Sequence, residues 1–380
     1  MRPWSARNSF RALLAIPGVL GLVPVSAAGA QAVEARLREG YDSNIYQVAS
    51  AADSTRVGGP YWRLRLGHRS EKRTQALFLR VRPEGRLQWY PQNSSANEYG
   101  AELNALARTL SGRPMLELTA SGGYERALFI RRQTREEFQT GAPVQTSPGG
   151  SQLPSRAFAA GELGLRFAVT SDVQILGGAF GSWTDYHDSR AGVRAFDSFD
   201  ARKAGLFLGA EVEAGRSWVF AARGQAADRV YPKREARDAD GESVDGTTRR
   251  YRDWELDLEG RFRNGSVEHR AIVELDHRED GFAGYYSYDA WSVDNRFRMG
   301  LGVFAEIELR YAYGRKRYAL YAPGGTPIRN RYHDASCEAV FAPGGMVQLA
   351  LGAIYDRTYS SDPLFDFGRG GVFAEARFGR

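Results

Sequence analysis

The sequence has one cysteine, few lysines and no apolar run long enough for a membrane-spanning helix. Cys337 has no partner for a disulfide within the chain, and a lone cysteine does not have the spacing of a metal site. The five histidines are scattered without such spacing, so we expect neither enzymatic activity nor a cofactor. No stretch of about 18 apolar residues occurs, so a membrane-embedded form of this chain has to be a closed β-barrel.

The N-terminal segment has the composition of an export signal. Three arginines precede an apolar stretch over residues 12–25, and small residues at 28–30 form a cleavage site. The apolar stretch is too short to span a bilayer as a helix. We therefore expect residues 1–30 to be a cleaved signal peptide and residues 31–380 to form one exported domain.

Apolar and charged residues alternate in many segments, of which residues 253–263 are the clearest. The even positions carry Trp, Leu, Leu, Gly and Phe, and every odd position is charged. A strand sorts a period of two onto its two faces, whereas a helix would spread it around its surface. One face of this segment must therefore meet an apolar environment and the other must meet water.

The same alternation predicts sixteen antiparallel strands. They cover residues 33–45, 61–69, 74–90, 98–110, 115–128, 157–169, 173–186, 201–214, 217–231, 250–263, 266–279, 287–301, 303–317, 330–343, 346–358 and 368–379. The connections alternate between short turns and longer polar loops, which is typical of outer-membrane barrels. A soluble β-sandwich would have shorter strands and a bulkier apolar face. We predict an all-β fold, an antiparallel transmembrane β-barrel of about 16 strands with short periplasmic turns and long external loops.

The dipeptide Asn264–Gly265 is a strong hairpin signal and predicts the register of its two strands. A two-residue loop at this dipeptide pairs residues whose numbers sum to 529. The predicted pairs are Phe262 with Val267, Leu256 with Val273, Trp254 with Leu275, Arg261 with Glu268 and Glu259 with Arg270.

The same register predicts two like-charge pairs further along the hairpin. It sets Glu255 opposite Glu274 and Asp253 opposite Asp276, and these carboxylates repel each other unless they are neutralised. We expect arginines from adjacent strands or loops to neutralise them, and a bound cation is the alternative.

Aromatic residues gather where the predicted strands meet the longer loops, as in the interfacial girdle of a membrane protein. The set comprises Trp62, Trp89, Tyr90, Tyr124, Trp183, Tyr186, Tyr231, Tyr251, Trp254, Tyr288, Trp291, Tyr332 and Tyr355. We expect these side chains to lie at the membrane interface.

Two segments resemble porin-like β-barrel families of Gram-negative bacteria. Residues 39–46 read Glu-Gly-Tyr-Asp-Ser-Asn-Ile-Tyr, which is similar to the first strand of these families and of the barrel in surface lipoprotein assembly modifiers. Residues 370–380, with Phe378 near their end, are similar to an outer-membrane insertion signal. The resemblance implies an outer-membrane location, with lipid and the barrel-insertion machinery as partners.

We expect a passive, porin-like channel for small polar or charged solutes. A barrel of this strand number is wide enough for a water-filled interior, and passage needs only pore width and a charge field. The alternative is a non-conducting structural, adhesive or assembly barrel. A homo-oligomer is compatible with either function, and no feature indicates nucleic-acid binding. The predicted pore-lining residues are Arg63, Arg65, Asp253, Glu255, Asp257, Glu259, Arg261, Glu268, Arg270, Glu274, Asp276, Arg296, Arg298, Glu306, Glu308 and Arg310.

One acidic loop has a weak resemblance to a calcium site. Asp238, Asp240, Glu242 and Asp245 alternate around a glycine, and Ca²⁺ takes several oxygen ligands from flexible loops. The bidentate glutamate that ends an EF-hand loop is absent. A solvated acidic loop is the first interpretation and a Ca²⁺ site is the alternative.

The third long loop, residues 129–156, is the longest and has the position of a loop that narrows the lumen in sixteen-strand porins. Charged residues of both signs stand near its start, and a mobile external loop is the alternative interpretation. The predicted constriction residues are Arg131, Arg132, Arg135, Glu136 and Glu137.

Deleting residues 133–153 tests the constriction hypothesis. Removing a segment that narrows the lumen should raise the single-channel conductance and weaken ion selectivity, both measured in planar bilayers. Unchanged conductance in a correctly inserted deletion variant would show that the loop does not line the pore.

Overall fold

The computed structural model describes residues 30–44, 57–111, 114–126, 155–187, 200–322, 326–341 and 347–379. The expected signal peptide lies outside these ranges except for Ala30, where the first strand begins. The expected constriction residues of the loop 129–156 also lie outside them.

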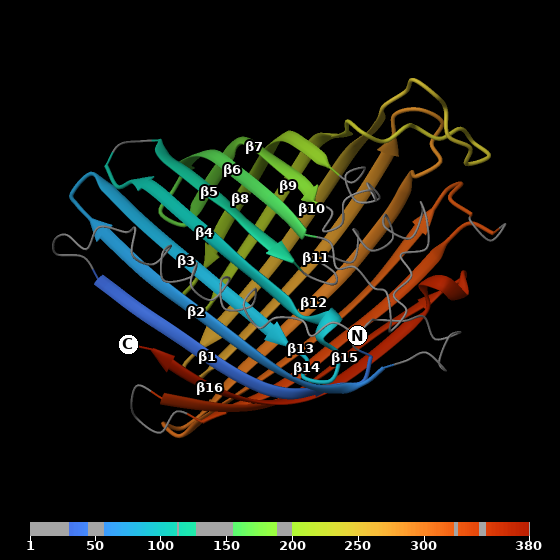
Figure 1. Ribbon diagram of the computed structural model, residues 1–380. Helices are drawn as coiled ribbons and strands as arrows, with labels where there is room; N and C mark the ends of the chain where they lie inside the picture. Colours follow the sequence, from blue (N-terminus) through green and yellow to red (C-terminus); the bar gives the residue numbers. More distant parts are fainter. Residues whose placement is uncertain are drawn as a thin grey trace.

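Within the described residues, sixteen antiparallel strands close into one barrel, which confirms the predicted fold class (Figure 1). The strands are β1 (Ala30–Asp42), β2 (Gly59–Arg73), β3 (Leu77–Trp89), β4 (Glu98–Thr109), β5 (Met115–Arg126), β6 (Ser155–Ala168), β7 (Val173–His187), β8 (Ala201–Ala214), β9 (Trp218–Tyr231), β10 (Arg249–Asn264), β11 (Val267–Asp280), β12 (Tyr288–Leu301), β13 (Ala305–Tyr318), β14 (Arg329–Phe341), β15 (Val347–Ser360) and β16 (Phe367–Gly379). Each strand pairs with its neighbours in the chain, and β16 pairs with β1.

The barrel closes where β1 meets β16. Their register runs from Glu34 opposite Gly379 to Asp42 opposite Gly371. Beyond the last pair, the Ser43 amide donates a hydrogen bond to the carbonyl of Gly370 at 2.9 Å. Closure pairs the edges that an open sheet would leave free, which is the condition for a sheet to cross a bilayer.

The connections separate the barrel into a short-turn rim and a long-loop rim. Longer connections at residues 43–58, 90–97, 127–154, 188–200, 232–248, 281–287, 319–328 and 361–366 alternate with short ones. In Figure 1 the start of β1 and the C-terminus lie at the short-turn rim, and the yellow connection between β9 and β10 projects from the other. Two 3₁₀ turns, η2 (Ser94–Ala96) and η4 (Pro363–Phe365), lie in the longer connections. No helix in the described part of the chain is long and apolar enough to cross a membrane.

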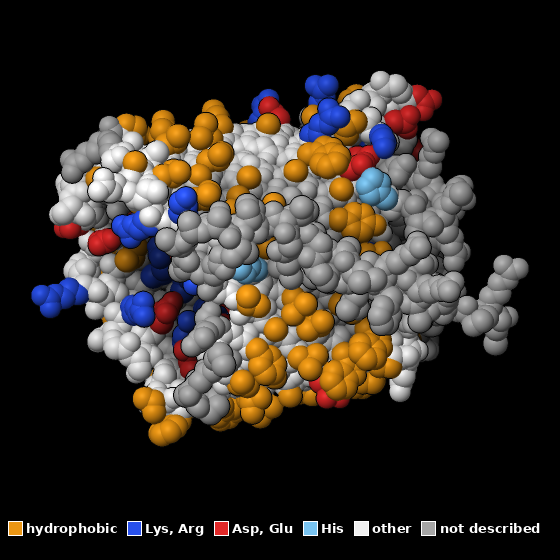
Figure 2. Space-filling view, turned by 60° about the vertical axis from the view of Figure 1, so that its left-hand side comes forward, with side chains coloured by type: hydrophobic (Ala, Val, Ile, Leu, Met, Phe, Trp, Pro, Cys, Tyr) orange, Lys and Arg blue, Asp and Glu red, His pale blue; other side chains and the backbone are white. Residues whose placement is uncertain are grey.

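The two faces of each strand differ in polarity. On β10 the outward side chains Trp254 and Leu258 are exposed, whereas the inward Asp253 is only 6% exposed. The barrel wall in Figure 2 is accordingly covered mainly by hydrophobic side chains, and charged ones gather towards its two ends. An apolar outer wall of this kind matches a lipid environment.

The predicted register of the β10–β11 hairpin is wrong by two residues. The turn consists of Gly265 and Ser266, and Asn264 lies opposite Val267, so that paired residue numbers sum to 531. Gly265 has a φ of 56° and occupies the first central position, which requires a positive φ in both favoured hairpin turns. The prediction had placed Asn264 at that position.

The shift leaves the two faces intact because strand side chains repeat every two residues. The observed pairs are Phe262 with His269, Leu256 with Leu275, Trp254 with His277, Arg261 with Arg270 and Glu259 with Ile272. Glu259 still accepts hydrogen bonds from Arg270, at 2.7 and 2.9 Å, as a diagonal neighbour. The remaining strand boundaries differ from the predicted ones by a few residues: β2, for example, includes the predicted turn 70–73, and the turn lies at 74–76.

Paired cysteines can distinguish the two registers. In a variant in which Cys337 is replaced by serine, cysteines at 256 and 275 should oxidise to a disulfide, because directly opposite Cβ atoms are about 4.5–5.5 Å apart. Cysteines at 256 and 273, the originally predicted pair, serve as the control and should oxidise much more slowly. Mass spectrometry measures the oxidation of each pair. Faster oxidation of the control pair would show that the paired residue numbers sum to 529.

Candidate functional site in the barrel lumen

The lumenal wall is a network of ion pairs in which carboxylates bridge arginines of neighbouring strands. Glu375 lies between Arg38 and Arg377, with contacts of 2.7 and 2.6 Å. Glu125 lies between Arg86 and Arg156 in the same way. Glu338 is a second carboxylate that contacts both Arg38 and Arg377, so this group is charge-balanced, whereas the two arginines at Glu125 share one carboxylate. Such shared contacts stiffen the wall.

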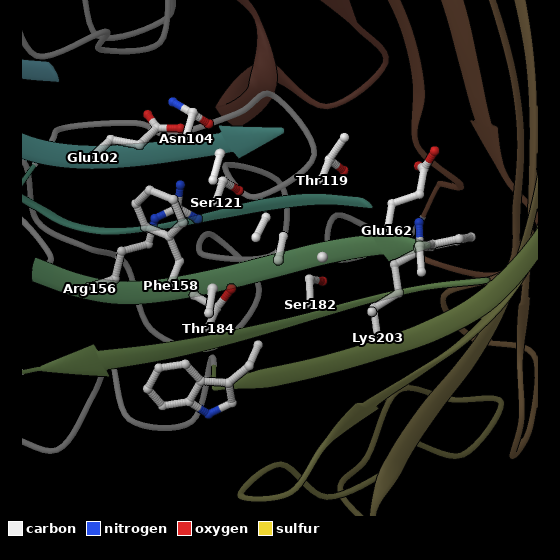
Figure 3. A pocket seen from close by; sticks show the side chains of 18 of the residues that line it. Glu102, Asn104, Thr119, Ser121, Arg156, Phe158, Glu162, Ser182, Thr184 and Lys203 are labelled. Atoms are coloured by element: carbon white, nitrogen blue, oxygen red, sulfur yellow. The ribbon is translucent and has the colours of Figure 1, made fainter. Parts of the chain in front are cut away.

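The larger cavity in the lumen has a volume of about 1120 Å³ and lies against β3–β9, with Arg69 of β2 also lining it (Figure 3). Its floor is a row of short side chains in direct register, from Asn104 through Ser121 and Ala160 to Ser182. The next position in this row is Lys203. The cavity exists because this part of the wall carries short polar side chains where other parts carry long ionic ones.

Basic side chains outnumber acidic ones around this cavity. Eight basic and four acidic residues line it: Arg69, Arg80, Arg82, Arg86, Arg156, Lys203, Arg223 and Arg229, with Glu98, Glu102, Glu125 and Glu162. Arg223 donates two hydrogen bonds to Glu162, at 3.3 and 2.7 Å. Lys203 lies over the ring of Phe180 at 5.3 Å from its centroid. The excess of positive charge gives the cavity an electrostatic preference for anions.

The sign of the wall changes at β10 and β11. Glu255 lies opposite Asp276 and Asp257 opposite Glu274, so like-charge pairs occur as predicted but with different partners. Glu255 accepts a hydrogen bond from Gln225 at 2.6 Å, and one oxygen of Asp257 is buried with no hydrogen-bond partner in the described part of the chain. These side chains form an acidic patch beside the basic cavity.

Of the four carboxylates predicted to form like-charge pairs, Asp253 has direct ion pairs with arginines. Asp253 contacts Arg278 at 2.8 Å and Arg229 at 3.0 Å. Glu274 instead accepts a hydrogen bond from Ser292 at 2.9 Å. The expected neutralisation by arginine therefore holds for Asp253, while neutral donors serve Glu255 and Glu274.

A second cavity of about 330 Å³ brings together six of the predicted pore-lining residues. It is lined by Glu259, Arg261, Glu268, Arg270, Arg296 and Arg298. The other ten lie at alternate positions of β2, β10, β11 and β13, where several contact lumenal neighbours: Arg63 with Gln88, Arg65 with Glu84, Glu306 and Glu308 with Arg298, and Arg310 with Asp294. A pore-lining role for this set stays a prediction.

The sequence predicts none of the residues around the larger cavity as pore-lining, and it assigns Trp183, Tyr186 and Tyr231 to the aromatic girdle. The strongest alternation signal comes from charged residues, and Thr119, Ser121, Ser182 and Thr184 are small and uncharged. Their alternation with Ala, Gly, Trp and Leu is visible in the sequence, but only the register brings Ser121 and Ser182 into one row and the two threonines beside it.

Part of the predicted aromatic girdle lies inside the barrel. Trp89, Tyr124, Trp183 and Tyr355 are exposed on the outer wall, as expected for a girdle, with 40–49% of their surface accessible. In contrast, Tyr90, Tyr186, Tyr231, Tyr251 and Tyr288 are at most 4% exposed. Tyr251 shares the inward parity of Asp253 on β10, which explains why the girdle assignment is wrong for such residues.

The buried rings form a tyrosine cluster that joins the long loops at one side of the rim. It consists of Tyr231, Tyr251, Tyr285, Tyr286, Tyr288, Tyr318, Tyr321, Ile328 and Phe365. Burial raises the pKa of the Tyr285 phenol, so this ring stays neutral. Because its members come from three connections and the adjoining strand ends, the cluster holds those loops as one packed unit.

Buried cations extend the tyrosine cluster into the lumen. Arg278 is 2% exposed and lies 4.4 Å from the ring centroid of Tyr251 and 4.9 Å from that of Tyr288. Lys316 lies 3.9 Å from the centroid of Tyr288. Cation–π contacts and the ion pair with Asp253 offset the loss of hydration of Arg278.

The acidic loop forms a polar turn. Asp238 accepts hydrogen bonds from the amides of Asp240 and Glu242, at 3.0 and 2.9 Å. Within the described ranges no group of three or more His, Cys, Asp or Glu side chains could hold a metal ion. The Ca²⁺ site and the solvated loop both stay predictions.

Comparisons with known proteins yield structural similarity only. No protein-family model and no curated protein matches the sequence. Among solved structures, OccK2 (OpdF) of Pseudomonas aeruginosa, crystallised with glucuronate, aligns with a TM-score of 0.42 and 10% identity over 92% of this chain and 98% of its own. An anion-selective porin from Comamonas acidovorans aligns with a TM-score of 0.46 and 12% identity over 93% and 99%. A BenF-like porin from Pseudomonas fluorescens gives 0.46 and 11% over 92% and 99%. The fold assignment rests on the strand pairing of the chain itself.

Replacing Arg278 by methionine should destabilise the barrel by about 3 kcal/mol, because it leaves the buried carboxylate of Asp253 with one arginine instead of two. Arg252→Gln is the matched control, since Arg252 and its partner Asp228 are exposed and such pairs contribute about 0–1 kcal/mol. Urea unfolding in detergent micelles measures both. Equal effects of the two substitutions would contradict the structural role of Arg278.

Proposed function

We propose that this chain is an outer-membrane, porin-like channel for small polar or charged solutes. One observation carries the proposal: a closed sixteen-strand barrel with an apolar outer wall encloses ionised cavities, the larger of about 1120 Å³. An apolar outer wall is stable in contact with lipid, and an ionised inner wall is stable in contact with water. Passage through such a lumen requires no chemistry from the protein.

The distribution of charge supports selection among charged solutes. The cavity along β3–β9 has an excess of basic side chains, and the patch on β10 and β11 is acidic. Opposite charges on adjacent sectors of one lumen create a lateral field that orients dipolar or charged solutes as they pass. The uncharged Ser and Thr side chains on the cavity floor offer hydrogen bonds without trapping an ion.

The alternative is a structural or assembly barrel with a closed lumen, and the tyrosine cluster is the observation that favours it. The cluster joins three long loops at one side of the rim, which narrows the lumen on that side. Its members lie between β9 and β16, however, and the larger cavity lies against β3–β9. The proposed path through the barrel therefore runs along the basic sector.

Purified protein should produce discrete conductance steps in planar bilayers. Lys203→Glu should shift the anion-to-cation permeability ratio towards cations by about twofold, and Glu102→Gln should shift it towards anions, because both side chains line the larger cavity. Reversal potentials across a salt gradient measure these ratios.

Arg252→Gln is the control for selectivity, because its side chain is exposed on the outer face of β10 and should leave the ratio unchanged. Absence of conductance from correctly folded protein would favour the closed barrel. If both lumenal substitutions left the anion-to-cation permeability ratio unchanged, the ion path would not run through the larger cavity.

A further inference from the structure

Four arginines form an exposed group on the outer face of β13 and β14 at the long-loop rim. Arg315 and Arg317 lie on β13, Arg329 and Arg331 lie on β14, and all four residues are exposed. Lys316, between the first two, is buried on the lumenal side, which places the arginines on the outer wall. We refer to these four residues as the arginine patch.

The arginine patch consists of two like-charge pairs. Arg315 lies directly opposite Arg331, and Arg317 directly opposite Arg329. Like charges at directly opposite positions destabilise a sheet. Among the described residues, no carboxylate lies within ion-pair distance of these four guanidinium groups. Asp289, which is opposite Arg317 in register, is hydrogen-bonded to His277 at 2.6 Å instead.

Another outward arginine at the same rim is neutralised by the protein. Arg252 on β10 contacts Asp228 on β9 at 3.5 Å and Glu279 on β11 at 4.0 Å. The four arginines of the patch have no such ion pair among the described residues, because the in-register neighbour of Arg317, Asp289, bonds to His277 instead. An external anion supplies the counter-charge that the protein does not.

Aromatic side chains border the arginine patch on the membrane side. Trp291 is in register with Arg315, and Tyr359 with Arg331. Tyr313 packs against Trp291 with ring centroids 5.4 Å apart and against His333 at 4.9 Å. Such aromatic residues mark the level of lipid headgroups. The patch therefore lies where phosphate-bearing headgroups meet the protein.

We propose that the arginine patch binds the phosphate groups of lipopolysaccharide in the outer leaflet. The inference rests on the proposed outer-membrane location, with the long-loop rim facing outward. A phosphate accepts paired hydrogen bonds from the planar guanidinium group. One phosphate between Arg315 and Arg331 turns a repulsive pair into a bridged one, and a second serves Arg317 and Arg329. A glycolipid that carries two phosphates places one phosphate at each of the two arginine pairs.

Binding of purified lipid A to detergent-solubilised protein, followed by native mass spectrometry, tests the proposal. The unsubstituted protein should retain diphosphoryl lipid A, and Arg315→Gln with Arg331→Gln should weaken binding at least about tenfold through loss of charge-assisted hydrogen bonds. Dephosphorylated lipid A should not be retained. Inorganic phosphate at equal concentration should not displace the lipid, since the aromatic border also contributes contact area.

Arg252→Gln is the matched control and should bind lipid A like the unsubstituted protein, because its charge is already compensated. Bound lipid A should also raise the unfolding temperature of the unsubstituted protein and leave that of the double variant unchanged. Equal retention by the double variant and the unsubstituted protein, or retention of dephosphorylated lipid, would overturn the proposal. The conductance of the double variant should stay normal, so a failed lipid site is distinguishable from a failed channel.

Discussion

The closed hydrogen-bonded ladder is the constraint on which the rest of this structure depends. Every strand pairs on both sides, and the pairing of β1 with β16 removes the last free edge. In lipid an unpaired amide or carbonyl carries a large free-energy penalty, so the sheet is stable there only as a closed ring. Closure also separates an outer face from an inner one, and strand alternation then sorts apolar and ionic residues between lipid and lumen.

The inner face meets two requirements that conflict. Charged side chains need water or partners, and a water-filled passage needs space. Bridging carboxylates such as Glu125 and Glu375 satisfy the charges along the wall, and short side chains on β4–β7 supply the space. At the long-loop rim, buried tyrosines and the cations beside them pack three connections together. The lumen is thus asymmetric, packed on one side and open to a cavity on the other.

The outer face is asymmetric as well. Arg252 is balanced by carboxylates from both neighbouring strands, and the four arginines of β13 and β14 are not. A lipid-facing wall tolerates charge only at its ends, where headgroups and water meet it. The uneven distribution of charge around one rim gives the barrel a preferred sector for anionic headgroups, independent of what passes through the lumen.

The strand count and the inward or outward direction of strand side chains were predictable from the sequence. Apolar and polar residues alternate within each segment, as in residues 253–263, and this alternation can be read without knowing the rest of the fold. The register of the β10–β11 hairpin was not predictable, because a shift of two residues keeps every side chain on the same face. The positive φ of Gly265, at the first central position of the turn, distinguishes the observed register from the predicted one. The larger cavity was not predicted, because Asn104, Ser121 and Ser182 come from three strands and are brought together only by the register of β4–β7.

The sequence by itself determined the barrel and the polarity of its faces, because alternation acts between near neighbours. Only the tertiary structure decided which tyrosines pack inside, which charges pair and where arginines oppose each other, because these contacts join residues far apart along the chain.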